Sequence, residues 1–509
     1  MKKIIYYILL LTVITSCKEQ ENASSIDVPI TTESSYNGNL ILGKKLENPY
    51  SVENMRKAYN NLKSGKVSHH VSSEEIEIKP THYYIRFKPR NQSELDSLKH
   101  DSTLVLYHYP LDYEITEGNT YYHDPSVPDS IPTFQYCSVP VGKTLPDAVE
   151  YEILSDLFIP DENSSEYTTS SVGVASEGFV EALVDEALRI TGNLPTKGNK
   201  NAKTLGGSWR PAGTIRIWDN TTNSWRGVEG VEVKARRWFT THEGTTNAAG
   251  YYSCNGTFRN DANYSLDWER YNFALRERWL DGANINGPKK EGNWNLDFSN
   301  GKSMFHAEVF MAAYHYYYKD IKGLRKPPEN GFFKTQLRIR CYDEENSESN
   351  GSHAPYRRFL GLGSAIKIYN PQNGIQSVYA TTIHEIAHAS HWNMDTKAYN
   401  NCDDILAESW ARGVQWELTR MVWAEYVPPY GRRKVGNSPS SPSWYNYTGV
   451  VEDMIDGRAG YDQVEGYTIR QVEDALKDQE SWDGLRNSIL NKYNNGTESN
   501  LVGLFDYWN

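Results

Sequence analysis

Two histidines four residues apart, His384 and His388, constrain this chain more than any other feature of its sequence. They enclose Glu385 in the segment 382–391, whose apolar residues recur with the period of a helix. Side chains four apart share a helix face, so both imidazoles can reach one metal ion. Glu385 lies beside that ion, where its carboxylate can take a proton from a water molecule. The segment therefore predicts a helix with two metal ligands and a general base.

The third ligand must come from elsewhere, because a catalytic zinc site takes three ligands from the protein and leaves a fourth position open. Glu408 lies twenty residues after His388, on a second predicted helix that opens near 403–404. A carboxylate within an apolar run is costly unless it meets a cation. Two antiparallel helices can bring Glu408 to the ion. We therefore predict Zn²⁺ held by His384, His388 and Glu408, with Glu385 as the catalytic base.

Several neighbouring residues have alternative interpretations. The other acidic candidates for the third ligand are Asp395, Asp403 and Asp404. The first continues the motif helix and cannot easily fold back, while the other two suit a helix N-terminus. Arg412 has the spacing of an ion pair with Glu408, although a substrate carboxylate would also suit it. His391 falls on the ligand face and is expected either to contact substrate or to hydrogen-bond elsewhere.

The HExxH motif at 384–388 and the downstream Glu408 together resemble the gluzincins, the thermolysin-like zinc metallopeptidases. The resemblance covers residues 300 to 425. It implies a mainly α-helical, zincin-type catalytic domain with a small sheet, which hydrolyses peptide bonds. It also implies an edge strand that holds the substrate backbone above the zinc, expected at Ala365–Tyr369.

The chain departs from the thermolysin pattern in two places. Arg412 stands where that pattern has Asp, and no histidine follows residue 391, so the usual histidine donor to the transition state is missing. A tyrosine can take that role. The candidates are Tyr399, Tyr430, Tyr445, Tyr447, Tyr461 and Tyr467. Two other hypotheses stay open: a surface-binding lipoprotein with little or no turnover, and a peptidase for glycoproteins or peptidoglycan stems.

The N-terminus predicts export. Lys2 and Lys3 precede an apolar run too short to span a membrane, which is typical of a signal peptide over residues 1–16. Ile14-Thr15-Ser16-Cys17 resembles the lipobox of bacterial lipoproteins, which implies that Cys17 carries the lipid. The alternative is a plain signal peptide with a chance cysteine. We expect a lipid-anchored protein of the bacterial outer membrane, with a flexible polar tether over 17–45.

The chain of 509 residues exceeds what one hydrophobic core supports, so we predict a multidomain α+β protein. Residues 46–160 are expected to form a small N-terminal α+β unit, and 161–205 a linker with one helix. Alternating apolar residues over 206–280 predict an Ig-like antiparallel β-sandwich. Its turn segment 245–252 resembles the carboxypeptidase-regulatory-like accessory modules. The catalytic domain is expected over 300–509.

Charge and cysteine content limit the partners. The net charge of -12 argues against binding to nucleic acid, which needs clustered Lys and Arg. The expected partners are a peptide or protein substrate and the membrane that holds the lipid. Four cysteines follow Cys17, and export permits disulfides, but their pairing stays open, with Cys341 and Cys402 as one possibility.

Overall fold

The computed structural model describes most of the chain after residue 38. The described residues are 39–508 without 66–75, 116–119, 161–166, 169–173, 176, 195–206, 279, 332–335, 345–350, 354–365, 371–373, 429–446 and 459–461. Cys17 lies outside them, so its acylation stays a prediction. Within this part of the chain, no helix combines the length and the apolar character that crossing a membrane requires.

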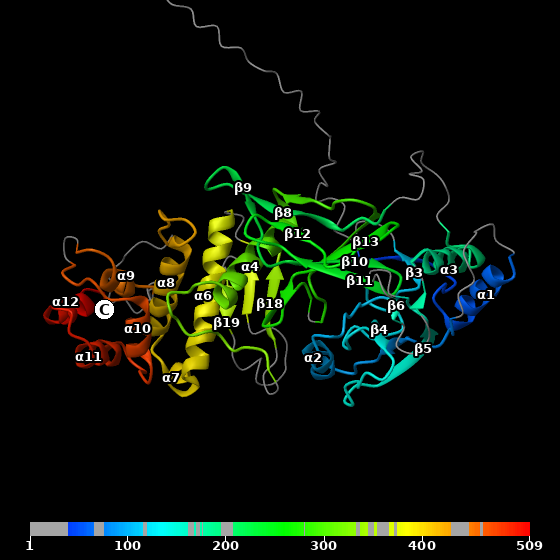
Figure 1. The fold of residues 1–509 in the computed structure, drawn as a ribbon. Coiled ribbons are helices and arrows are strands. Elements are labelled where there is room, and N and C mark those ends of the chain that lie inside the picture. Colours follow the sequence, from blue (N-terminus) through cyan, green and yellow to red (C-terminus); the bar gives the residue numbers. More distant parts are fainter. Residues whose placement is uncertain are drawn as a thin grey trace, which may run out of the picture. The chain divides into compact units, whose positions relative to one another are not determined.

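The protein has a mixed α+β fold with several sheets (Figure 1). Its first part holds an antiparallel sheet in the order β4-β2-β5. The elements of this part are β1 (Leu42–Lys45), α1 (Val52–Lys63), β2 (His82–Phe87), α2 (Gln92–His100), β3 (Tyr113–Ile115), β4 (Gln135–Pro140), β5 (Tyr151–Leu157), β6 (Tyr167–Thr168), β7 (Val174–Ala175) and α3 (Glu177–Ile190). The helices α1 and α3 pack against each other. Apolar residues at helical spacing, Met55 and Ala58 of α1 and Leu183 and Ala187 of α3, explain this contact because they share one core.

Two sheets with a common core follow. One has the strand order β11-β10-β13-β16, and the other has β12-β8-β17 with β9 paired to β8. Their strands are β8 (Ala212–Asp219), β9 (Ser224–Gly227), β10 (Glu232–Arg237), β11 (Thr240–Thr245), β12 (Tyr251–Ser253), β13 (Ala262–Asp267), β16 (Asn284–Lys290) and β17 (Leu296–Phe298). Alternate residues of β8 and β10 are buried, including Ile215, Ile217, Val233 and Ala235. These four side chains lie in one hydrophobic cluster, which joins the two sheets.

A five-stranded sheet lies next to the helix that carries the HExxH motif. Its order is β14-β15-β18-β20-β19, with β15, β18 and β20 parallel and β19 antiparallel to β20. The strands are β14 (Glu269–Arg270), β15 (Phe273–Arg276), β18 (Leu337–Tyr342), β19 (Gly351–His353) and β20 (Ile366–Tyr369). The expectation of an edge strand at Ala365–Tyr369 is wrong, because β20 lies between β18 and β19. Ile366 and Ile368 are fully buried, as an interior strand requires, and β19 ends the sheet in the part of the chain that the structure describes.

Three long helices form the core around the motif. These are α4 (Gly301–Tyr318), α6 (Ile375–Met394) and α8 (Asp404–Arg420), and α6 packs against both of the others (Figure 1). Gly374, which precedes α6, has a φ of 90°, a left-handed value that favours glycine. The shorter helices are α7 (Thr396–Asn401), α9 (Val450–Ile455), α10 (Ile469–Leu476), α11 (Trp482–Lys492), a 3₁₀ turn (Glu498–Asn500) and α12 (Leu501–Trp508).

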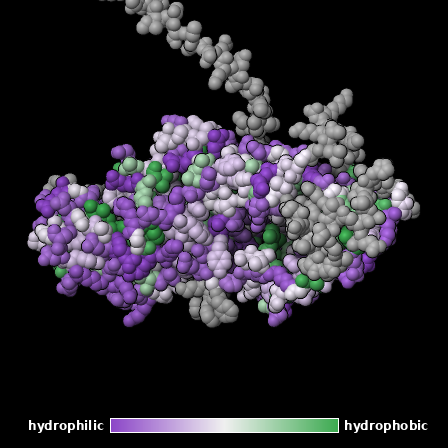
Figure 2. Space-filling model, in the orientation of Figure 1, coloured by the Kyte–Doolittle hydropathy of each residue, from purple (hydrophilic) through white to green (hydrophobic). Residues whose placement is uncertain are grey.

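Two further features are the hydropathy of the surface and the state of the cysteines. The face drawn in Figure 2 is largely hydrophilic, and its hydrophobic patches are small and separate. Four described cysteines are free thiols: Cys137, Cys254, Cys341 and Cys402. The possible disulfide between Cys341 and Cys402 is therefore not formed.

Candidate metal centre

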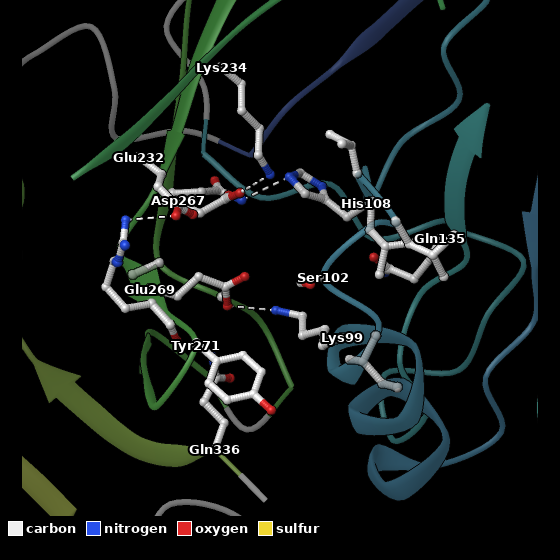
Figure 3. A pocket seen from close by; sticks show the side chains of 18 of the residues that line it. Lys99, Ser102, His108, Gln135, Glu232, Lys234, Asp267, Glu269, Tyr271 and Gln336 are labelled. Atoms are coloured by element: carbon white, nitrogen blue, oxygen red, sulfur yellow. Dashed lines mark hydrogen bonds and ion pairs between the residues drawn. The ribbon is translucent and has the colours of Figure 1, made fainter. Parts of the chain in front are cut away.

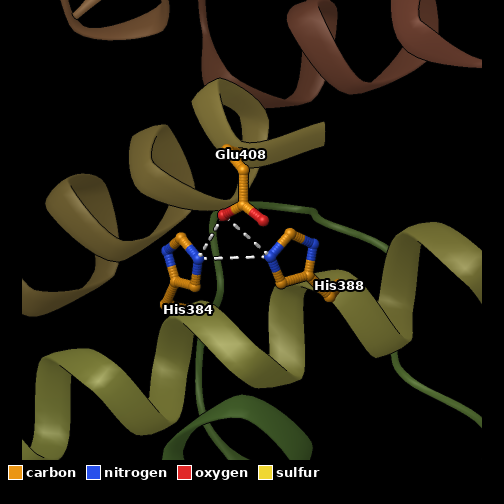
Figure 4. Close-up of side chains that lie close together, drawn as sticks. All are labelled: His384, His388 and Glu408. Atoms are coloured by element: carbon orange, nitrogen blue, oxygen red, sulfur yellow. Dashed lines mark hydrogen bonds and ion pairs between the residues drawn. The ribbon is translucent and has the colours of Figure 1, made fainter. Parts of the chain in front are cut away.

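The three predicted metal ligands converge on one point (Figure 4). His384 and His388 lie one turn apart on α6, and Glu408 reaches them from α8. The two histidine Nε2 atoms are 3.1 Å apart. Oε2 of Glu408 lies 3.1 Å from Nε2 of His384 and 3.3 Å from Nε2 of His388. A helix pair thus brings together residues from two separate segments of the chain.

These separations fit the donor set of a zinc ion. Ligand atoms bound tetrahedrally to zinc at their usual distances lie about 3.3 to 3.5 Å from one another, within a few tenths of an ångström of the separations between these donors. Two imidazole nitrogens and one carboxylate oxygen are the ligands of many catalytic zinc sites. The residues present therefore suit Zn²⁺.

Gln415 fixes the orientation of the first histidine. Its Oε1 lies 3.1 Å from Nδ1 of His384, and its Nε2 donates to the hydroxyl of Tyr426 at 2.7 Å. An amide oxygen only accepts, so Nδ1 of His384 carries the proton and Nε2 turns a lone pair toward the centre. Sequence reasoning missed Gln415, although it lies seven residues after Glu408 and so on the same face of α8.

The charges of the ligands influence one another strongly. Burial opposes ionisation of Glu408, but the two histidines outweigh it and hold the pKa of this carboxyl well below its usual range. Burial lowers the pKa of His384. For His388, the nearby Glu408 carboxylate outweighs burial and raises the pKa. The centre thus holds an ionised carboxylate in a largely buried place, which favours a bound cation.

Glu385 lies beside the centre, outside the group of three ligands. It is only 6% exposed, and burial raises its pKa to about 8, helped by the negative charge of Glu408. A cation at the centre would favour the ionised form of Glu385. Gly351 of β19 makes room for this side chain, since a Cβ at position 351 would lie 2.7 Å from both Cγ and Oε1 of Glu385. The edge strand therefore covers the predicted general base.

Two of the tyrosine candidates flank the two histidine ligands. The ring centroid of Tyr447 lies 5.6 Å from that of His384, and the centroid of Tyr399 lies 6.2 Å from that of His388. Tyr467 instead donates a hydrogen bond to Glu498 at 3.0 Å. The other three candidates, Tyr430, Tyr445 and Tyr461, fall outside the described residues.

The acidic alternatives to Glu408 have structural roles. Asp395 ends α6 and accepts hydrogen bonds from the backbone N–H groups of 397 and 398, so it caps α7. Asp403 occupies the N-cap position of α8 and accepts from the backbone N–H of Trp482 at 3.1 Å, while Asp404 stands in the first turn. These carboxylates lie outside the group formed by the two histidines and Glu408.

Arg412 and His391 are both almost fully buried. The expected ion pair between Arg412 and Glu408 is wrong. Arg412 points toward α9 and pairs there with Glu452, with its Nε 2.9 Å from Oε1. His391 packs its ring edge-on against Tyr399, with centroids 5.0 Å apart, and burial lowers its pKa to about 3. It is therefore a neutral residue of the site wall.

A second group of charged residues lines a cavity (Figure 3). The cavity has a volume of about 240 Å³, and none of the described residues that line it belongs to α6 or α8. Lys234 pairs with Asp267 at 2.8 Å, and Lys99 pairs with Glu269 at 2.6 Å, as Figure 3 shows. Arg270 pairs with Glu232 at 2.7 Å. Three cation–carboxylate pairs thus line this cavity, together with the buried Arg276, whose Nη1 donates to the backbone carbonyl of residue 280.

No family model matches the sequence, and no curated protein matches it significantly. What the protein does must therefore be inferred from its own residues and their geometry.

Proposed function

We propose that this protein is a zinc-dependent peptidase of the gluzincin type, exported and held at the bacterial outer membrane by a lipid on Cys17. One observation carries the proposal: the donor atoms of His384, His388 and Glu408 lie 3.1 to 3.3 Å apart, with the buried Glu385 beside them. Structural zinc sites usually take four protein ligands. A set of three with an adjacent carboxylate instead favours hydrolysis.

The proposed chemistry assigns each proton to a residue of this chain. A bound Zn²⁺ supplies a Lewis acid that polarises the scissile carbonyl and makes water more acidic. Glu385 accepts a proton from the water that attacks the carbonyl carbon. The C–N bond then breaks, and Glu385 returns the proton to the leaving amine. Water thus provides the hydroxyl of the new carboxyl group and the proton of the new amine.

The proposed substrate is an extended segment of polypeptide along β19. This strand ends the described sheet next to α6, and its partner on the other side is β20. Main-chain groups at a sheet edge can pair with an added strand, which gives affinity that depends little on side chains. Such binding favours unfolded chains and exposed loops. A peptide stem of a glycoprotein or of peptidoglycan would fit the same edge.

We further propose domain assignments for the two parts that surround the site. The shared core of the sheets built from β8 to β13, β16 and β17 supports an Ig-like β-sandwich similar to carboxypeptidase-regulatory-like accessory modules. The packing of α4, α6 and α8 beside the five-stranded sheet supports a zincin-type catalytic domain. Among the residues named for catalysis, none comes from the first assembly.

The test compares the zinc-loaded mature chain with its Glu385→Gln variant on a denatured protein mixture, with cleavage products read by mass spectrometry. We expect wild-type cleavage and a loss of at least about 100-fold in the variant, the usual range for a general base. Zinc content, measured by elemental analysis, should be equal in both. A wild-type protein that holds zinc and cleaves nothing would contradict the proposal and favour a surface-binding lipoprotein.

A further inference from the structure

The edge strand β19 brings a second functional side chain to the centre. Gly351 touches Glu385, and His353, two residues further on, lies on the same side of the strand because alternate residues share a face. The ring of His353 is parallel to that of His388, with an angle of 2° and a centroid separation of 6.4 Å. An imidazole thus reaches the site from upstream of the HExxH motif.

Tyr399 of α7 orients this imidazole. Its hydroxyl lies 3.4 Å from Nδ1 of His353, and its ring packs edge-on against the rings of His388 and His391. A tyrosine hydroxyl can donate or accept, and in the arrangement that we consider it donates to Nδ1. A neutral imidazole that accepts at Nδ1 carries its proton on Nε2. In that arrangement, the proton of the His353 ring is on Nε2.

We propose that His353 is the catalytic residue that donates a hydrogen bond from Nε2 to the oxyanion of the transition state, and that Tyr399 is its positioning residue. The proposal rests on the peptidase function, because the oxyanion develops only when water adds to a carbonyl. As the carbon–oxygen double bond opens, its electron pair moves to oxygen, and Glu385 takes the proton of the water. His353 transfers no proton. It stabilises the negative charge. In the thermolysin pattern a downstream histidine has this role, but in this chain no histidine follows residue 391.

The location of His353 favours it over Tyr447 on the other flank. A substrate paired with β19 would have its backbone carbonyls next to this strand, so donor and substrate would be positioned by the same element. A donor fixed on a strand needs no reorganisation when the charge develops, and that is what makes such groups effective. Tyr447 contacts the ring of His384 from a different segment of the chain.

The first test measures hydrolysis by the zinc-loaded mature chain with His353→Phe, His353→Gln and Tyr399→Phe. Loss of one donor to an oxyanion lowers kcat about 100-fold or more, and we expect this for His353→Phe with KM and zinc content nearly unchanged. The amide of His353→Gln can still donate and should recover part of kcat. Tyr399→Phe should lower kcat less than His353→Phe. Tyr467→Phe, whose lost hydroxyl binds Glu498, is the control and should keep wild-type kcat.

Two results would overturn the assignment. Wild-type kcat in His353→Phe, with a large loss in Tyr447→Phe, would make Tyr447 the donor. Loss of zinc from His353→Phe would make the residue a support of the metal site and not a donor.

A binding measurement separates this proposal from the peptidase function itself. A peptide phosphonamidate carries a tetrahedral anion like that of the transition state, so calorimetry should show weaker binding to zinc-loaded His353→Phe by at least about tenfold. If the wild type binds this probe but cleaves no peptide, the peptidase function fails, and the probe still decides the role of His353. Equal affinity of both proteins, or no binding by the wild type, would overturn the donor assignment.

Discussion

The metal centre and the polar cavity both gather charged residues, but they balance them differently. In the cavity, three of the lining cations each face a carboxylate, as Lys234 faces Asp267 at 2.8 Å. In the metal centre, two imidazole nitrogens and one carboxylate oxygen face one another within 3.1 to 3.3 Å. Groups that all offer lone pairs converge stably around a cation, whereas an internally paired cluster is balanced without a ligand. The comparison therefore separates a group of side chains that suits a cation from a group that is largely joined in ion pairs.

Removal of the carboxylate ligand should have the largest effect. Glu408→Ala takes away one of three protein ligands, and we expect zinc affinity to fall by more than about 100-fold, beyond the effect of an outer contact. Chelator competition with elemental analysis measures this. Asp404→Ala, also on α8 but exposed, is the matched control and should keep its zinc. If Glu408→Ala still binds zinc tightly, another residue must be the third ligand. The contrast between the metal centre and the cavity would then no longer rest on Glu408.

A methyl group on the edge strand should disturb the base and leave the metal in place. Gly351→Ala puts a Cβ 2.7 Å from Oε1 of Glu385, so the carboxylate must move. A displacement of about 1 Å can cost about 100-fold in rate, and we expect kcat to fall on that scale while zinc content stays constant. The control is Gly331→Ala, whose Cβ would meet no atom within 4 Å. An unchanged kcat would show that Glu385 is not the base.

Loss of the hydrogen bond between Gln415 and His384 should have an intermediate effect on zinc affinity. Gln415→Ala removes the acceptor of the Nδ1 proton of His384, and such contacts are worth about 10- to 100-fold in metal affinity. Activity should return when zinc is in excess, because the three ligands remain. Titration of the metal-free protein with zinc gives the affinity. If affinity does not change, the hydrogen bond at 3.1 Å does not orient the ligand.

Substitutions in the cavity should change the stability of the protein and leave its zinc content unchanged. Lys234→Met leaves Asp267 without its partner, and we expect a loss of about 2 kcal/mol in the free energy of unfolding. The double variant Lys234→Met with Asp267→Leu should recover much of that loss, since neither charge is then left unpaired. Chemical denaturation with parallel zinc analysis checks both. A changed zinc content would mean that cavity and centre are coupled, and the two regions would no longer be independent.

The sequence predicted the parts of the site that depend on local patterns. The spacing of His384 and His388 and the apolar run around Glu408 indicated α6 and α8, because helical periodicity and ligand spacing are visible within a short window. β19 escaped prediction because the three residues Gly351–His353 have no apolar alternation, and their pairing with β20 depends on contacts beyond the neighbouring chain. Arg412 was assigned the wrong partner for the same reason: Glu452 lies forty residues away in sequence.

The position of α6 between α4 and α8 has a consequence for how the protein matures. His384 and His388 are 6% and 5% exposed, and the third ligand comes from another helix, so the site exists only once α6 and α8 have docked. Ligands that assemble in this way make metal uptake part of folding, and the binding free energy then adds to the stability of the folded chain. For the exported protein proposed above, this step would fall after translocation, and the supply of zinc outside the cytoplasm would then govern how much of the chain reaches its native state.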